Sequence, residues 1–300
     1  MTAAAYQWYR LHVRSQSVWT QREFWVIRSR SRGVRGGTGA PAHRVGGRGL
    51  KTLSVVIPAL NEAGNLAAVM ETIPFAELSQ AGWDTEVVIV DNASTDGTGQ
   101  VARSLGARVV EQPRRGYGNA YQAGFDAVSG DVIATGDADR TYPFDALPHL
   151  LSALDEQDAD FLTTNRLLRE NHGAMKRSHT VANHALSAVS RMLFRNELRD
   201  SQSGMWVFRR EVWKGLDVRS PGMAFSQEIK NAAGCAGYRV LEVPIEYRPR
   251  GGDVKLNAFS DGFGNLRQLF EHRFRRADGG NDVADPGTGV LTQQEQFEAV

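Results

Sequence analysis

The fold is decided by one stretch near the middle of the chain, Val132-Ile133-Ala134-Thr135-Gly136-Asp137-Ala138-Asp139. Its first four residues predict a short buried strand, because they are apolar or β-branched. Two carboxylates one residue apart follow that strand. They form a small, hard, oxygen-only site, which suits a divalent cation that is itself neutralised by phosphates. The stretch therefore points to a nucleoside diphosphate as the ligand.

Two upstream segments are organised in the same way, each as an apolar run that ends in polar and turn residues. They are Leu53-Ser54-Val55-Val56-Ile57-Pro58-Ala59-Leu60-Asn61-Glu62 and Glu86-Val87-Val88-Ile89-Val90-Asp91-Asn92-Ala93-Ser94-Thr95-Asp96-Gly97-Thr98. The acidic triplet Asp137-Ala138-Asp139 alone is weak evidence, since acidic residues are common in loops after strands. Three such strands are stronger evidence, because open parallel sheets bind ligands at the carboxyl ends of their strands.

Strand-like and helix-like segments alternate along the chain without internal repeats. This alternation predicts an α/β fold with a mostly parallel sheet and helices on both faces. We expect strands near residues 53–57, 85–90, 107–111, 131–135, 160–164, 204–209 and 239–247. We expect helices near residues 65–73, 98–105, 117–128, 144–156, 175–195, 225–235 and 258–275.

Taken in order, these motifs resemble the inverting family 2 glycosyltransferases of the GT-A fold. The resemblance covers about residues 53–274 and rests on Pro58-Ala59-x-Asn61-Glu62, Asp91-Asn92-x-Ser94-x-Asp96-Gly97-Thr98 and Asp137-x-Asp139. Three later segments are similar to polyprenyl- or dolichyl-phosphate sugar synthases. They are Asp139-Arg140-Thr141-Tyr142-Pro143, Gln202-Ser203-Gly204 and Glu242-Val243-Pro244-Ile245 with Arg250-x-Gly252-x-x-Lys255-Leu256. The resemblance implies a Rossmann-like nucleotide-binding half followed by an acceptor-binding half.

The resemblance also implies a reaction and a donor site. A hexose would pass, with inversion, from a UDP- or GDP-hexose to a polyprenyl phosphate, with Mg²⁺ or Mn²⁺ assisting. Asp139 is then the metal ligand and catalytic residue, and Asp137 reaches the ribose or the metal. Base and ribose would be surrounded by Pro58, Asn61, Glu62 and Asp91. Asp96 is better explained as a helix cap.

The acceptor phosphate would need cations and polar groups, for which the motifs offer Arg166, Gln202, Ser203, Arg250 and Lys255. Arginine gives bidentate contacts to phosphate and lysine a point charge. A phosphate monoester has a second pKa of about 6, so it is anionic at neutral pH and needs no strong base. An alternative enzyme with a hydroxyl acceptor would need a base, and we consider Glu228 and Asp200 for that role. Glu228 is equally explained as an acidic residue in the first turn of a helix.

Two positions depart from the family pattern. Thr141 stands where many dolichyl-phosphate mannose synthases have a glutamine metal ligand, and Val254 stands where a serine usually precedes Lys255-Leu256. A hydroxyl is a poorer ligand than an amide carbonyl. Metal coordination would therefore rely on Asp139, phosphates and water.

Composition and charge divide the chain into three parts. The 300 residues suit one α/β domain plus tails. Residues 1–50 carry nine Arg and one acidic residue, for a net charge of +8, whereas the rest of the chain is at −7. We therefore expect an Arg-rich disordered leader at 1–50, the GT-A domain at 51–276 and a disordered tail at 277–300. The single cysteine, Cys235, excludes an intramolecular disulfide, and its small neighbours predict a packed thiol.

No window of 18 apolar residues predicts a transmembrane helix, so we expect a cytoplasmic protein peripheral to the inner face of the membrane. Aromatic and aliphatic residues recur at helical spacing near the end of the domain, among arginines. They are Phe259, Phe263, Leu266, Leu269, Phe270 and Phe274. Such a stripe suits an anionic bilayer surface, or alternatively packing on the sheet. A membrane-protein partner stays open, as does a non-catalytic sugar-nucleotide-binding subunit, although the intact acidic triplet argues against the latter. The leader arginines alone suggest nucleic acid, which we do not expect as a partner.

Overall fold

The fold begins with β1 (Lys51–Ala59), whose residues from Leu53 to Ile57 are all buried. A strand that is apolar on both sides belongs in the middle of a parallel sheet covered on both faces. In the computed structural model, which describes residues 50–171, 173–251 and 258–278, β1 has that place. It pairs in parallel with β2 (Trp83–Asp91) and with β4 (Val132–Thr135).

The described strands form one seven-stranded sheet in the order β3-β2-β1-β4-β6-β5-β7. The other strands are β3 (Arg108–Glu111), β5 (Phe161–Asn165), β6 (Trp206–Arg209) and β7 (Val240–Pro244). The antiparallel strand β6 lies between β4 and β5, and the other neighbours run parallel. The chain moves outward from β1 to β3 and returns to β4 on the other side of β1. This change of direction is a topological switch point, where open α/β sheets bind ligands.

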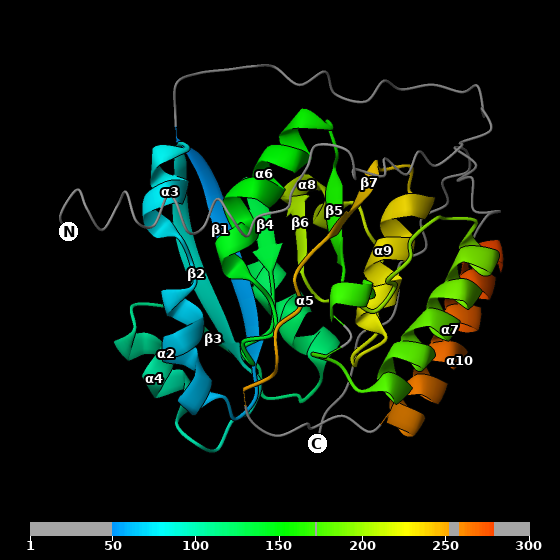
Figure 1. Cartoon of the computed structure of the whole chain (residues 1–300), viewed down its shortest axis with the longest axis horizontal. Coiled ribbons are helices and arrows are strands. Elements are labelled where there is room, and N and C mark those ends of the chain that lie inside the picture. Colours follow the sequence, from blue (N-terminus) through cyan, green and yellow to red (C-terminus); the bar gives the residue numbers. More distant parts are fainter. Residues whose placement is uncertain (1–49, 172, 252–257, 279–300) are drawn as a thin grey trace, which may run out of the picture.

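Helices cover both faces of the sheet, as the sequence predicts (Figure 1). One face packs on α2 (Ala63–Glu71), α3 (Phe75–Gln80), α4 (Thr98–Ser104) and α6 (Leu147–Glu156). The opposite face packs on α5 (Tyr117–Ala127), α8 (Arg210–Lys214) and α9 (Phe225–Cys235). A hydrophobic core lies on each face of the sheet. Alternate residues of β1 pack into the two cores, Val55 and Ile57 into one and Val56 into the other.

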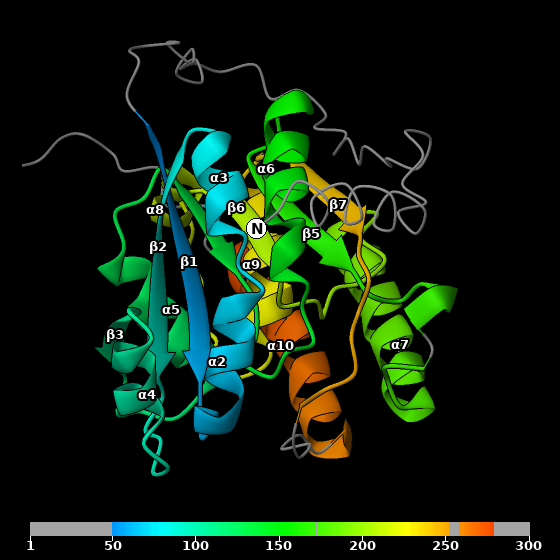
Figure 2. The ribbon, with the colours of Figure 1, turned by 60° about the vertical axis from the view of Figure 1, so that its left-hand side comes forward.

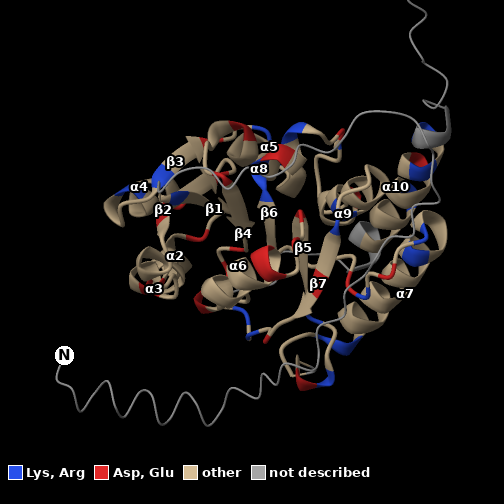
Figure 3. Cartoon of the chain, turned by 90° about the horizontal axis from the view of Figure 1, so that it is seen from above, with Lys and Arg blue, Asp and Glu red and all other residues tan. Residues whose placement is uncertain are grey.

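Two long helices pack against each other beside the β7 end of the sheet, away from β1 and β2 (Figures 1 and 2). They are α7 (Arg177–Phe194) and α10 (Ala258–Asp278), and α10 also contacts α9. Seen from above, both helices carry basic residues (Figure 3). No helix within the described ranges is long and apolar enough to cross a membrane.

The expected strands and the longer expected helices are all present, with ends that shift by a few residues. The sequence analysis missed α3 and α8, because six and five residues are too few to show a helical period. The prediction of a packed Cys235 thiol is wrong. Cys235 is exposed in the last turn of α9, where small neighbours leave it uncovered. The predicted leader, apart from Leu50, and the tail from residue 279 lie outside the described residues.

Candidate active site

The acidic triplet lies directly after β4, at the switch point of the sheet. Asp139 is 3% exposed, and its Oδ1 accepts hydrogen bonds from the Thr141 backbone N–H at 3.1 Å and from the Thr141 hydroxyl at 2.6 Å. These two bonds close a tight turn around Arg140, which has a positive φ of 71°. Thr141 therefore orients the Asp139 carboxylate.

Asp137 lies next to Asp139 and has a different environment. Its Oδ1 accepts a hydrogen bond from the Tyr117 hydroxyl at 3.0 Å. Burial, together with the nearby Asp139 carboxylate, raises the pKa of Asp137 to about 7. Two neighbouring carboxylates that resist simultaneous ionisation favour a cation between them or beside them.

Arg250 reaches the triplet from the segment that follows β7. Its Nη2 lies 2.5 Å from Asp139 Oδ2. The main chain holds this approach, because the Gly251 N–H donates to Asp139 O and the Arg248 N–H donates to Thr141 O, each at 2.9 Å. A side chain at Gly251 would collide with Asn65, so glycine permits this close approach. The predicted cation Lys255 lies outside the described residues.

The triplet fits a divalent cation that also binds substrate phosphates. Asp139 Oδ2 is buried, and among the described residues it forms an ion pair with Arg250 but accepts no hydrogen bond of normal geometry. Within residues 50–171, 173–251 and 258–278, no three acidic, His or Cys side chains are placed so that they could hold a metal ion by themselves. Two carboxylates with phosphates and water are the set that suits Mg²⁺ or a similar hard cation. Arg250 approaches the same oxygen, so the cation and this guanidinium would compete for it.

The predicted nucleotide-binding residues lie at the carboxyl ends of β1 and β2. Pro58 lies within β1, opposite Val90. Asp91 ends β2 and accepts a hydrogen bond from the Ser94 N–H at 3.0 Å. Gly99 makes room for this carboxylate, because a Cβ there would lie 2.7 Å from Asp91 Oδ2.

Asn61 and Glu62 lie in the segment that follows β1, and Asn61 is hydrogen-bonded to the segment that follows β2. Asn61 has a positive φ of 53°, and its Oδ1 accepts a hydrogen bond from the Thr95 N–H at 2.8 Å. Glu62 accepts a hydrogen bond from the Asn65 amide at 2.7 Å. Asp96 lies outside the N-cap positions of α2 and α4, which are Glu62 and Gly97, but its carboxylate accepts hydrogen bonds from the first backbone N–H of each helix, those of Ala63 and Thr98.

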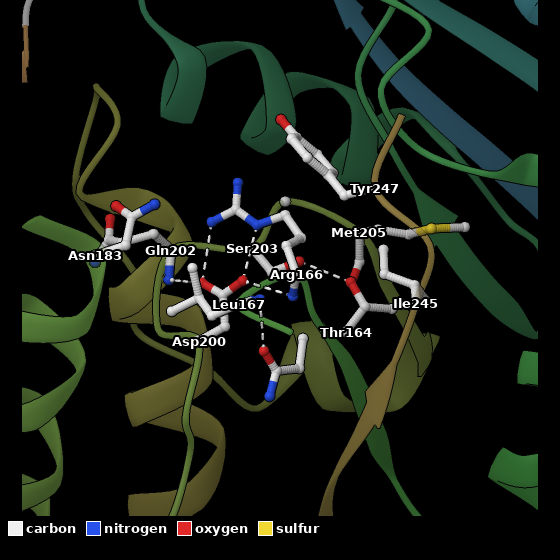
Figure 4. Close-up of polar contacts among 12 residues, drawn as sticks. Thr164, Arg166, Leu167, Asn183, Asp200, Gln202, Ser203, Met205, Ile245 and Tyr247 are labelled. Carbon is white, nitrogen blue, oxygen red and sulfur yellow. Dashed lines mark hydrogen bonds and ion pairs between the residues drawn. The ribbon is translucent and has the colours of Figure 1, made fainter. Parts of the chain in front are cut away.

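Arg166 forms a buried bidentate ion pair with Asp200 (Figure 4). Its Nε and Nη2 donate to the two carboxylate oxygens at 2.8 and 3.0 Å, and its backbone N–H donates to Oδ2 at 3.0 Å. Burial alone would raise the pKa of Asp200, but the charge and hydrogen bonds of Arg166 outweigh it and lower that pKa. Asp200 is therefore an ionised partner of Arg166 and a poor candidate for a base.

A cavity of about 180 Å³ adjoins both Arg166 and Arg250. Its walls come from the sheet edge on one side and from α7 and α10 on the other. The lining includes Thr141, Met175, His179, Asn183, Leu186, Gln202, Met223, Tyr247 and Asn265. The two arginines that the sequence predicts for the acceptor phosphate thus share one cavity beside the acidic triplet.

Three other predicted residues have different surroundings. Ser203 is fully buried, and its hydroxyl lies 2.7 Å from that of Thr164, below the cavity. Gln202 lines the cavity, but its side-chain amide is hydrogen-bonded to other side chains. Glu228 is fully buried and does not line this cavity; it accepts from the Arg219 and Ser220 N–H groups and pairs with Arg275 at 2.6 Å. The structure does not bring Ser203 and Glu228 to the cavity with the two arginines.

Two buried ionisable groups near Asp200, Lys230 and Glu242, were not predicted from the sequence. Lys230 donates to the carbonyls of Asp200 and Ser203 at 3.1 and 2.9 Å, and burial lowers its pKa to about 7. Burial raises the pKa of Glu242 to about 7, and this carboxylate accepts hydrogen bonds from the Arg199 and Asp200 N–H groups. A single lysine on an amphipathic helix normally faces water, so the sequence gives no signal for Lys230.

The fold and the family of this chain are those of the glycosyltransferases of the GT-A fold. Residues 54–216 match the family described as Glycosyl transferase family 2, and the chain belongs to that family. It is 41% identical over 218 residues to the low-salt glycan biosynthesis hexosyltransferase Agl6 of Haloferax volcanii, covering 72% of this chain and 52% of that protein. It is 33% identical over 210 residues to the dolichyl-phosphate hexose transferase of the same organism, covering 70% and 89%. The chain thus spans about half the length of Agl6.

Solved structures share the fold. Glucosyl-3-phosphoglycerate synthase of Mycobacterium tuberculosis, in complex with Mn²⁺, UDP and glucosyl-3-phosphoglycerate, superposes with a TM-score of 0.59 at 23% identity, over 80% of this chain and 83% of that one. Mannosyl-3-phosphoglycerate synthase of Rubrobacter xylanophilus gives a TM-score of 0.61 at 20% identity, over 80% and 79%. These likenesses confirm the predicted GT-A fold.

Proposed function

We propose that this protein transfers a hexose, with inversion, from a nucleoside diphosphate sugar to the phosphate of a polyprenyl phosphate. The observation that carries the proposal is the cavity in which Arg166 and Arg250 lie beside Asp139. A diphosphate donor and an anionic acceptor both need cationic groups at their meeting point. Two relatives support this acceptor, namely the dolichyl-phosphate hexose transferase of Haloferax volcanii and the dolichol-phosphate mannosyltransferase of Pyrococcus furiosus.

In the proposed reaction, an acceptor phosphate oxygen attacks the anomeric carbon while the bond from that carbon to the donor diphosphate breaks. The acceptor is already anionic at neutral pH, so no side chain has to remove a proton. The hydrogen bonds of Glu228 and the ion pair of Asp200 agree with this, since neither carboxylate is placed as a base in the cavity. Asp137 and Asp139 would hold Mg²⁺ or Mn²⁺, which supplies positive charge to the leaving diphosphate.

We assign Arg250 to the boundary between donor and acceptor. It contacts Asp139 on one side and lines the cavity on the other. Arg166 is held rigidly by Asp200, so its guanidinium offers a fixed charge to the acceptor. We further propose that residues 51–276 form the catalytic domain, with Pro58, Asn61, Glu62 and Asp91 around the nucleotide.

We also propose that the protein works at the cytoplasmic surface of a membrane, where its acceptor lies. Three phenylalanines of α10 are exposed, with Phe263 at 73%, Phe270 at 40% and Phe274 at 61%. The predicted stripe on this helix is divided, because Leu269 is fully buried. The exposed aromatic face, flanked by Arg267 and Arg273, suits an anionic bilayer surface.

The test is a transfer assay with radiolabelled UDP- and GDP-hexoses and a short polyprenyl phosphate. The matching polyprenol serves as a second acceptor, and each reaction runs with and without excess EDTA. We expect label in the lipid phase only with the phosphate and only when metal is present. Label on the polyprenol alone would overturn the phosphate acceptor, and full transfer in EDTA would overturn the metal.

A further inference from the structure

Three amide side chains from distant parts of the chain form a closed ring of hydrogen bonds. Gln202 precedes β6, Gln227 belongs to α9 and Asn265 belongs to α10. Gln202 Nε2 donates to Gln227 Oε1 at 2.8 Å, and Gln227 Nε2 donates to the Asn265 main-chain carbonyl at 2.6 Å. Asn265 Nδ2 closes the ring by donating to Gln202 Oε1 at 3.1 Å. Each of the three residues therefore donates and accepts within the ring.

The ring admits one arrangement of the Gln227 amide. Reversing it would place Nε2 against the Gln202 Nε2 and Oε1 against the Asn265 carbonyl, so two donors and two acceptors would face each other. Gln227 is fully buried. Its Nε2 also donates a hydrogen bond to Gln268 Oε1 at 2.7 Å. A buried polar network of this kind is costly when only one member is lost, because the remaining groups stay away from water without partners.

The ring joins two walls of the acceptor cavity. Gln202 and Asn265 both line that cavity. Gln227 is hydrogen-bonded to both of them. The Gln202 backbone N–H also donates to Asp200 Oδ1 at 3.1 Å, so the same loop is tied to the carboxylate that holds Arg166. The described part of α10 packs on α7 and α9. The ring is thus a direct polar link from α10 to the loop that positions Arg166.

We propose that Gln227 is a positioning residue that holds α10 and the Asp200–Ser203 loop in one fixed arrangement around the acceptor. This inference rests on the proposed function of the cavity. The donor site after β4 contributes no residue to the ring. Opening the ring should therefore weaken acceptor binding and leave reactions of the bound donor intact.

The experiment uses the full chain with Gln227→Leu and Asn265→Ala, and with Glu271→Gln as a control on the exposed side of α10. Three quantities are measured for each protein: the KM for a short polyprenyl phosphate, kcat for transfer, and slow hydrolysis of the nucleotide sugar without acceptor. One or two lost hydrogen bonds correspond to an acceptor KM about 10-fold higher. We expect that increase in both ring variants, with donor hydrolysis within about twofold of the wild type. Glu271→Gln should match the wild type throughout.

An unchanged acceptor KM, or a parallel loss of transfer and donor hydrolysis, would overturn the positioning role. If Gln227→Leu does not fold, Asn265→Ala decides, because it opens the ring but leaves the main-chain carbonyl in place. If the wild type transfers nothing to polyprenyl phosphate, the proposed function fails separately. Hydrogen exchange of α10 amides then decides whether the ring holds the helix. Faster exchange in the ring variants supports the link, and equal exchange refutes it.

Discussion

The proposed donor and acceptor sides of this site are built in opposite ways. On the proposed donor side, Asp91 is the last residue of β2, and Asp137 and Asp139 lie just beyond β4. The nearby groups Ser94 and Thr141 orient the carboxylates of Asp91 and Asp139. On the acceptor side, Arg166 is fixed by Asp200, which Lys230 and Glu242 hold from other elements. A local site can be recognised from adjacent residues, whereas a site assembled by long-range contacts depends on the whole fold.

The largest effect should come from the donor side. Asp139→Asn removes the charge that would hold the cation, so we expect turnover to fall by about 10³-fold or more with the fold intact. Steady-state transfer assays and circular dichroism measure the two properties. Asp155→Asn is the matched control, because the Asp155 carboxylate lies at the surface, where it pairs with Lys51 and Arg209. Near-normal transfer by Asp139→Asn would refute the metal role.

A second prediction concerns the acceptor side, where a substitution should affect stability first. Asp200→Asn leaves the Arg166 guanidinium buried without its anionic partner. Removing one member of a buried pair typically costs about 3–5 kcal/mol in the free energy of unfolding. Urea unfolding measures this cost, and titration with the nucleotide shows whether the donor site of the folded fraction survives. A change under 1 kcal/mol would mean that the pair is not integral to the acceptor side.

The same contrast explains what the sequence could predict. Strand positions were predictable, and Asp137 and Asp139 could be singled out as candidate ligands, because strand, turn and acidic residues are contiguous in the run from Val132 to Asp139. The arginines of the cavity were suggested by motifs. Their partners were not, because Lys230 and Gln227 act through elements that meet only in the folded chain. The sequence around Glu228 suggested a base near the acceptor. In the fold, its position in α9 directs the carboxylate to the backbone N–H groups of Arg219 and Ser220 and to Arg275.

The buried lysine beneath the acceptor loop predicts a pH dependence of stability. Burial lowers the pKa of Lys230 from its ordinary 10.5 to about 7. Below pH 7 the amine is protonated in both states and the burial penalty is complete. Between pH 7 and 10.5 the unfolded chain binds more protons than the folded one, so the free energy of unfolding rises with pH. Urea unfolding of wild type and Lys230→Met across this range should show that rise only in the wild type.

Glu242 provides an internal comparison of opposite sign. Its pKa is raised from 4.5 to about 7, so the folded state binds the extra proton between these values. Its contribution to stability therefore falls as the pH rises from 4.5 to 7, and Glu242→Gln should remove that fall. A flat difference between wild type and either variant across its range would show that the residue titrates normally in the folded protein.

The smallest effect should follow from Glu228→Gln, which separates the two candidate acceptors. The substitution removes the charge that pairs with Arg275, whose side chain is 37% exposed, but keeps an oxygen that can accept from the Ser220 N–H. Since a phosphate acceptor needs no base, we expect transfer to polyprenyl phosphate by the folded protein to fall less than about threefold. Parallel assays with polyprenyl phosphate and polyprenol measure this directly. Efficient transfer to the alcohol by the wild type, lost in Glu228→Gln, would show that this carboxylate acts as a base despite its buried hydrogen bonds. The acceptor side would then not depend on the fixed charge of Arg166, and the proposed contrast with the donor side would be wrong.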